Sequence, residues 1–81
     1  MSSDKKLIEK FQSVPLPKDI DFDEFKKYLS LFGYILVRTA GSHNIFINKE
    51  KNLTLCVPTI NGKKVKTEYL KQANIQIKKE D

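Results

Sequence analysis

Three short apolar runs, separated by turn residues, constrain the fold of this chain more than any other feature. Each run is rich in β-branched or aromatic side chains, as strands are, and they cover residues 34–38, 44–47 and 53–57. Gly41 and Ser42 form a turn signal between the first two runs, and a polar loop over residues 48–52 precedes the third. Pro58 has no N–H to donate to a neighbouring strand and therefore ends the third run. The pattern predicts a three-stranded antiparallel sheet.

A helix is predicted immediately before this sheet, over residues 21–33. One stripe of large apolar side chains repeats there at helical spacing and is formed by Phe22, Phe25, Leu29 and Phe32. Asp21, with Glu24 three residues later, forms an acidic capping box at the start. Gly33 suits the left-handed conformation that often ends a helix. This stripe should supply much of the core.

The first twenty residues are predicted to form a short helix and a linker. Residues 4–11 carry apolar side chains at helical spacing, namely Leu7, Ile8 and Phe11. The sequence Val-Pro-Leu-Pro at residues 14–17 then ends the helix, because each proline forces the preceding residue out of the α region. The apolar Val14 and Leu16 predict that this linker lies against the body of the protein.

A last helix is predicted over about residues 64–78, where Leu70, Ala73 and Ile77 share one face. The order is then helix, linker, helix, three strands and helix. Layer rules place both long helices on one face of the sheet and leave the other face open. We therefore expect an α+β protein of one domain over residues 1–81, with an N-terminal helix and linker (residues 1–20) and a core (residues 21–78).

The residue types exclude several classes of site. The 81 residues include one cysteine and one histidine, Cys56 and His43, so neither a disulfide nor a zinc site can staple the chain. Only Glu50 accompanies His43 near the strands, too few ligands for a metal-dependent nuclease. A glycine-rich phosphate loop is also lacking. We expect no metal and no cofactor.

Cys56 alternates with Thr54 along the third strand, and we interpret it as a small packed side chain. A nucleophilic pair of Cys56 with His43 is the alternative. That pair would require an exposed Cys56 and a third group to orient the imidazole.

The chain contains no run of the ~18–20 apolar residues that span a bilayer and no apolar signal-peptide core. We expect a cytoplasmic protein with no membrane partner. The formal net charge of +5 favours attraction to a polyanion such as nucleic acid, although solubility alone would also explain it.

His43 is the candidate catalytic residue. RNA carries its own nucleophile, the 2′-hydroxyl, so a neutral imidazole that accepts its proton can promote cleavage without a metal. Positioned acid–base catalysis of this kind contributes roughly 10²–10⁴-fold. DNA lacks the hydroxyl, so the chemistry favours RNA. An ordinary hydrogen-bonding role at the turn is the alternative for His43.

Lys63, Lys64 and Lys66 gather where the last helix is predicted to begin, and Arg38 lies next to the first turn. The helix dipole disfavours cations at this end unless an anion compensates them. Backbone N–H groups together with lysines suit a phosphate. A solvated surface is the alternative interpretation of these lysines.

Several short motifs follow one another in a fixed order between residues 22 and 77. They are Gly33-Tyr34, Gly-Ser-His-Asn-Ile-Phe at residues 41–46, Val57-Pro58, the lysine-rich residues 61–66, and Tyr-Leu-Lys-Gln-Ala at residues 69–73. In order and spacing they resemble the HicA-type toxin family of small mRNA interferases. The resemblance implies a fold like the double-stranded-RNA-binding domain, α-β-β-β-α. It also implies metal-free cleavage of mRNA, and silencing by a HicB-type antitoxin that covers the site.

Carried over by position, the resemblance makes His43 the catalytic histidine, with Gly41 and Ser42 shaping its turn. The lysines of residues 61–66 would then face the RNA. The chain departs from the family at Thr59-Ile60, where many members carry a second histidine, and in its N-terminal residues 1–20, which many short members lack. A non-catalytic RNA-binding or protein-interaction module of the same fold is the alternative function.

Overall fold

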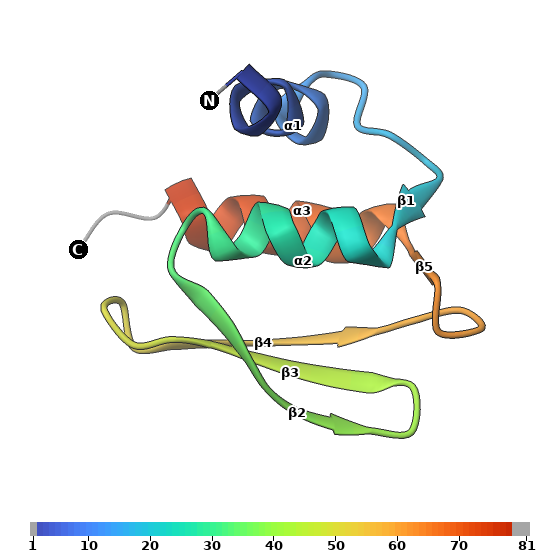
Figure 1. The fold of residues 1–81 in the computed structure, drawn as a ribbon, viewed down its shortest axis with the longest axis vertical. Helices are drawn as coiled ribbons and strands as arrows, with labels where there is room; N and C mark the ends of the chain where they lie inside the picture. Colours follow the sequence, from blue (N-terminus) through green and yellow to red (C-terminus); the bar gives the residue numbers. More distant parts are fainter. Residues whose placement is uncertain (1, 79–81) are drawn as a thin grey trace.

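A three-stranded antiparallel sheet forms one side of the molecule, and helices cover one of its faces (Figure 1). The computed structural model describes residues 2–78. The strands, in sheet order, are β2 (Tyr34–Ala40), β3 (His43–Asn48) and β4 (Leu53–Pro58). The helices are α1 (Ser2–Gln12), α2 (Phe22–Ser30) and α3 (Thr67–Lys78). The predicted α+β fold, α-β-β-β-α with an additional N-terminal helix, is confirmed.

The sheet separates a buried face from an open one. Phe46, Leu55 and Val57 are buried beneath α2 and α3, whereas their alternating neighbours Ile45 and Cys56 face the other way. Figure 1 shows both α2 and α3 on the same side of the sheet. The prediction that both long helices lie on one face is correct, and the opposite face is open.

The helix predicted from residue 21 forms as α2 and is held by the expected cap. The side chain of Asp21 accepts a hydrogen bond from the backbone N–H of Glu24 at 3.4 Å. The helix ends at Ser30, and a turn then leads to Gly33, whose φ is +91°. Tyr28 lies outside the predicted stripe yet is fully buried, because α1 packs against that side of α2.

The N-terminal helix α1 forms the outermost layer, beyond α2 and α3 (Figure 1). Its Leu7 and Phe11 belong to the core cluster. The expectation for the linker is correct for Leu16, which packs against the core. It is wrong for Val14, whose side chain is 94% exposed. The linker therefore contacts the body at Leu16 and at Pro17, whose carbonyl accepts a hydrogen bond from the Thr67 hydroxyl at 2.7 Å, but not at Val14.

The final helix begins at Thr67, so the prediction that it begins at about Lys64 is wrong. Residues Lys64–Val65 instead form a short strand, β5, which pairs antiparallel with β1 (Ile20–Asp21). In this pair Ile20 lies opposite Val65, and both are buried. Burial of two β-branched side chains against the core therefore outweighs the helical preference of the neighbouring lysines.

Among the helices formed by residues 2–78, none is long and apolar enough to cross a membrane.

Candidate catalytic turn and the adjoining hollow

His43 is the first residue of β3 and directly follows the turn at Gly41 and Ser42. Gly41 has a φ of +61°, a conformation that glycine adopts readily. In the sheet, His43 lies opposite Ala40 on β2 and opposite Pro58 on β4. Its side chain is exposed on the open face. The structure therefore places the imidazole at the end of the sheet, where a large substrate can reach it.

Asn44, the residue after His43, points to the opposite side and is buried. Its side-chain oxygen Oδ1 accepts a hydrogen bond from Thr39 Oγ1 at 3.0 Å, and its side-chain amide nitrogen Nδ2 donates to the backbone carbonyl of Val57 at 3.0 Å. The same amide donates to the carbonyl of Ser42 at 3.3 Å. One side chain thus ties all three strands to the turn that carries His43.

The turn is also bonded to the segment that follows β4. The backbone N–H of Thr59 donates to the carbonyl of Ser42 at 2.9 Å, and the Thr59 hydroxyl lies 3.4 Å from the same oxygen. Together with Asn44, these bonds hold Ser42 from two directions. The position of His43 is consequently fixed by its neighbours in the chain, although its own side chain is exposed.

Sequence reasoning missed Asn44 as part of this site. A polar residue between His43 and Ile45, at a position where strand alternation turns it inward, was the available signal. A buried amide needs partners, and the ends of three strands provide them here.

Cys56 is exposed, so its interpretation as a small packed side chain is wrong. It lies opposite Ile45 on the open face, and its Sγ is 3.8 Å from Nδ1 of His43. The exposed position required for a nucleophilic pair is therefore present. The orienting third group is not: within residues 2–78, no carboxylate accepts a hydrogen bond from His43.

The basic residues expected at the site separate into three places. Arg38 is exposed and lies opposite Ile45, on the face of the sheet that carries His43, after a register shift between Leu36 and Arg38. Lys64 forms an exposed ion pair with Asp19 at 3.4 Å. Lys63 is exposed in the turn before it.

Lys63 shares a hollow with two acidic residues. It lines a hollow of about 150 Å³ together with Asp21 and Asp23. Lys66 is the residue before α3, and no hydrogen-bond or ion-pair partner contacts its side chain within residues 2–78. Of the three lysines, Lys64 alone forms an ion pair within residues 2–78.

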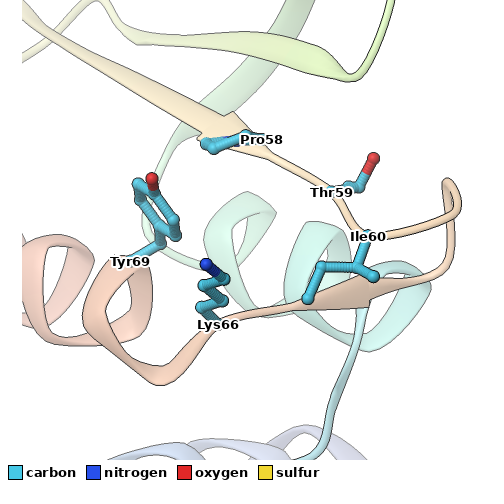
Figure 2. Close-up of a pocket in the computed structure, with 5 residues that line it drawn as sticks. All are labelled: Pro58, Thr59, Ile60, Lys66 and Tyr69. Atoms are coloured by element: carbon cyan, nitrogen blue, oxygen red, sulfur yellow. The ribbon is translucent and has the colours of Figure 1, made fainter.

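A second hollow, of about 280 Å³, lies between the end of β4 and the start of α3 (Figure 2). Its lining residues come from the end of β4, the segment after it and the start of α3, and they are Pro58, Thr59, Ile60, Lys66 and Tyr69. Pro58 is the strand partner of His43, and Thr59 is bonded to Ser42. The hollow and the imidazole therefore share the same end of the sheet.

Residues 2–78 contain no group of three or more histidine, cysteine, aspartate or glutamate side chains that could hold a metal ion. The chemistry available at the turn is consequently that of an imidazole, a neighbouring thiol and nearby cations.

Comparison with known proteins supports the family suggested by the motifs. A family model described as the HicA toxin of bacterial toxin-antitoxin matches residues 22–79, from the start of α2 onward. No curated protein and no solved structure matches the chain. Helix α1 and the linker lie outside the matched region.

Proposed function

The chain belongs to the HicA toxin family of bacterial toxin–antitoxin systems, and we propose that it is a metal-independent endoribonuclease in which His43 is the catalytic residue. The observation that carries this proposal is an exposed imidazole on a turn held by Asn44 and by the Ser42–Thr59 hydrogen bond. Such an arrangement presents a proton acceptor in a defined position without closing the site to a polymer.

In the proposed reaction, His43 accepts the proton of a ribose 2′-hydroxyl. The 2′-oxygen then forms a bond to the adjacent phosphorus, and the bond from phosphorus to the 5′-oxygen of the next nucleotide breaks. The imidazolium returns its proton to that leaving oxygen, so the products are a 2′,3′-cyclic phosphate and a 5′-hydroxyl. Arg38, on the same face as His43, is placed to stabilise the negative charge on the phosphate oxygens.

The test is cleavage of RNA by the purified full chain in the presence of EDTA. We expect the wild type to cleave and His43→Ala to be at least about 10²-fold slower, because acid–base catalysis would be lost. Thr54→Ala removes another exposed side chain of the sheet and should cleave normally. Equal rates for the wild type and His43→Ala would contradict the proposed role of the histidine.

Membership of a toxin–antitoxin family implies an antitoxin partner. We propose a HicB-type protein that covers the open face around His43. Strand β2, at the edge of this sheet, carries exposed apolar side chains, with Ile35 53% and Val37 49% exposed. Exposed apolar surface of this kind is typical of protein–protein contacts. The target, mRNA, places the protein in the cytoplasm.

A non-catalytic RNA-binding or protein-interaction module is the second candidate. It is favoured by the lack of a carboxylate partner for His43 within residues 2–78, since such a partner orients imidazoles in many hydrolytic sites. RNA binding without cleavage by the wild type would support this module over the nuclease.

A further inference from the structure

The hollow next to the catalytic turn has one apolar wall and one free cation. Pro58 and Ile60 provide aliphatic surface from the β4 side, and Tyr69 provides an aromatic ring from α3. Figure 2 shows Lys66 and Tyr69 extending from the start of α3 toward Pro58, at the end of β4. The exposed ammonium of Lys66 has no ion-pair or hydrogen-bond partner within the part of the chain that the structure describes.

Tyr69 is held in place without being enclosed. It is half-buried and packs against the core cluster, while its hydroxyl makes no hydrogen bond to any of residues 2–78. Lys66 is three residues earlier, so the two side chains lie on the same side of the first helical turn. The backbone N–H of Tyr69 donates to the carbonyl of Lys66 at 3.1 Å, which closes that turn. A fixed ring and a free ammonium are thus side by side.

We propose that this hollow binds one nucleobase of a single-stranded RNA, stacked on the ring of Tyr69, with an adjacent phosphate held by Lys66. The inference rests on the proposed function and adds a binding subsite to it. Sequence-specific and sequence-tolerant RNA binding both use bases stacked on aromatic side chains, with cations following the backbone. Bases inside a duplex are stacked on each other and are not available for such a contact.

The size and the position of the hollow agree with a single base. Its volume of about 280 Å³ is just below the range for drug-sized ligands, which starts near 300 Å³, as expected for a site that takes one base. Thr59, which lines the hollow, is bonded to Ser42, and Ser42 adjoins His43. A base in the hollow would therefore belong to a nucleotide near the phosphodiester presented to the imidazole.

The test measures binding rather than cleavage. Full-length chain carrying His43→Ala is titrated with a fluorescent single-stranded uridine dodecamer and with the same oligomer bearing abasic riboses at its central positions. We expect Tyr69→Leu, which removes the ring but keeps apolar volume, to weaken binding of the intact oligomer about 10-fold. The abasic oligomer should bind equally to both forms, because it has no base to stack. Tyr69→Phe keeps the ring and should retain the preference for the intact oligomer.

Lys66→Gln is expected to weaken binding of both oligomers, and to lower the slope of log affinity against log salt by about 0.7, one phosphate contact on a single strand. Lys5→Gln, the same charge change at an exposed position of α1, is the matched control and should leave the slope unchanged.

Equal losses for the intact and abasic oligomers on Tyr69→Leu would overturn the stacking proposal, as would no loss for either. If Tyr69→Leu fails to fold, photo-crosslinking of a 4-thiouridine oligomer to the chain with an intact Tyr69 decides the matter. Adducts at Tyr69 or Lys66 support the subsite, and adducts found only elsewhere overturn it.

This subsite and the nuclease proposal can fail separately. Cleavage in EDTA by the wild type, with no effect of Tyr69→Leu on binding, removes the subsite and leaves the nuclease. The expected binding pattern in a chain that does not cleave removes the nuclease and leaves a base-binding module.

Discussion

At the residue scale, the turn that carries His43 is held by the buried side-chain amide of Asn44 and not by the histidine itself. The side chain of Asn44, on β3, is bonded to Thr39 on β2, to Ser42 in the turn and to Val57 on β4. The side chain of its sequence neighbour His43 makes only the 3.8 Å approach to Cys56 within residues 2–78. The position of the imidazole therefore depends on Asn44, a residue whose own side chain is buried.

Replacing Asn44 with alanine should lower both stability and cleavage. The carbonyl of Val57 would lose its amide donor in a buried setting, and an unmet buried polar group costs about 1–3 kcal/mol. Chemical denaturation gives the loss of unfolding free energy, and cleavage is measured on the fraction that remains folded. Thr39→Val removes one of the three bonds and should have the smaller effect. Wild-type cleavage by folded Asn44→Ala would contradict a positioning role.

Variants of Cys56 can separate a chemical role of its thiol from the effect of its position beside His43. Cys56→Ser should cleave RNA as well as the wild type, because the thiol lacks the third group that a nucleophilic pair requires. Alkylation of Cys56 should block cleavage, since it places a bulky group at a sulfur 3.8 Å from His43 Nδ1. Cleavage assays on treated and untreated protein test both statements, with alkylated Cys56→Ser as the control. A loss in Cys56→Ser as large as in His43→Ala would instead make the thiol catalytic.

At the scale of elements, α1 contributes to the core although it lies outside the family match. Phe11 is fully buried, with its ring centroid 5.0 Å from that of Tyr28 in an edge-to-face arrangement. Its backbone carbonyl accepts a hydrogen bond from the buried side chain of Asn74 at 2.9 Å. Helix α1 therefore connects α2 to α3, and we propose that residues 1–20 fold with the core as one domain.

Phe11→Ala should destabilise the protein by about 3–5 kcal/mol, the usual cost of removing a buried aromatic ring. Lys5→Ala on the exposed side of the same helix should change the unfolding free energy by less than about 0.5 kcal/mol. Urea denaturation of the two variants measures both values. A loss below about 1 kcal/mol for Phe11→Ala would show that the core does not depend on α1.

The long elements could be predicted from the sequence, and the short ones could not. The stripe of α2 and the alternation of β3 and β4 repeat over six or more residues, which is enough for a period to be visible. β1 and β5 have two residues each, and their pairing depends on contact between Ile20 and Val65 across the chain. Such a contact leaves no periodic signal.

The candidate site was predictable in part for similar reasons. Gly41 and Ser42 identify a turn by residue type alone, so the location of His43 follows from local sequence. The nearness of Cys56, the bonds of Asn44 and the hollow at Tyr69 depend on strand register and on where α3 begins. An error of three residues at that helix start placed Lys64 in a helix, whereas it lies in β5.

At the scale of the whole molecule, helices fill one side of the sheet and leave its other face available. Two tyrosines hold α3 in place, one from α2 and one from the sheet. Tyr28 donates to the side chain of Asn74 at 2.5 Å, and Tyr34, on β2, donates to Gln76 of α3 at 2.6 Å. Burial raises the pKa of Tyr28 above its ordinary 10.0, an effect reduced by the hydrogen bond from Gln12, and burial likewise raises the pKa of Tyr34.

Stability should consequently fall at alkaline pH. Raised pKa values in the folded state mean that folding favours the neutral phenols. Their contribution is complete below about pH 10, the ordinary pKa of tyrosine, and is lost as the pH rises through the higher folded values. Urea denaturation between pH 8 and pH 11 should show the decrease. Tyr34→Phe cannot ionise there and should lose less stability over the same interval, whereas an identical decrease would exclude Tyr34 as a source.

The single register shift in β2 has a geometric consequence for the site. Leu36 pairs with Phe46 on the side of the helices, so uninterrupted alternation would turn Arg38 to that side as well. Because Val37 is an additional residue in the strand, each residue after it faces the side opposite to the one that regular alternation would give it. Arg38 therefore lies across from Ile45. With Val37 paired regularly to Ile45, the guanidinium of Arg38 would instead point to the apolar interior. The register shift thus decides whether the positive charge of Arg38 lies on the face of the imidazole or on the face of the core.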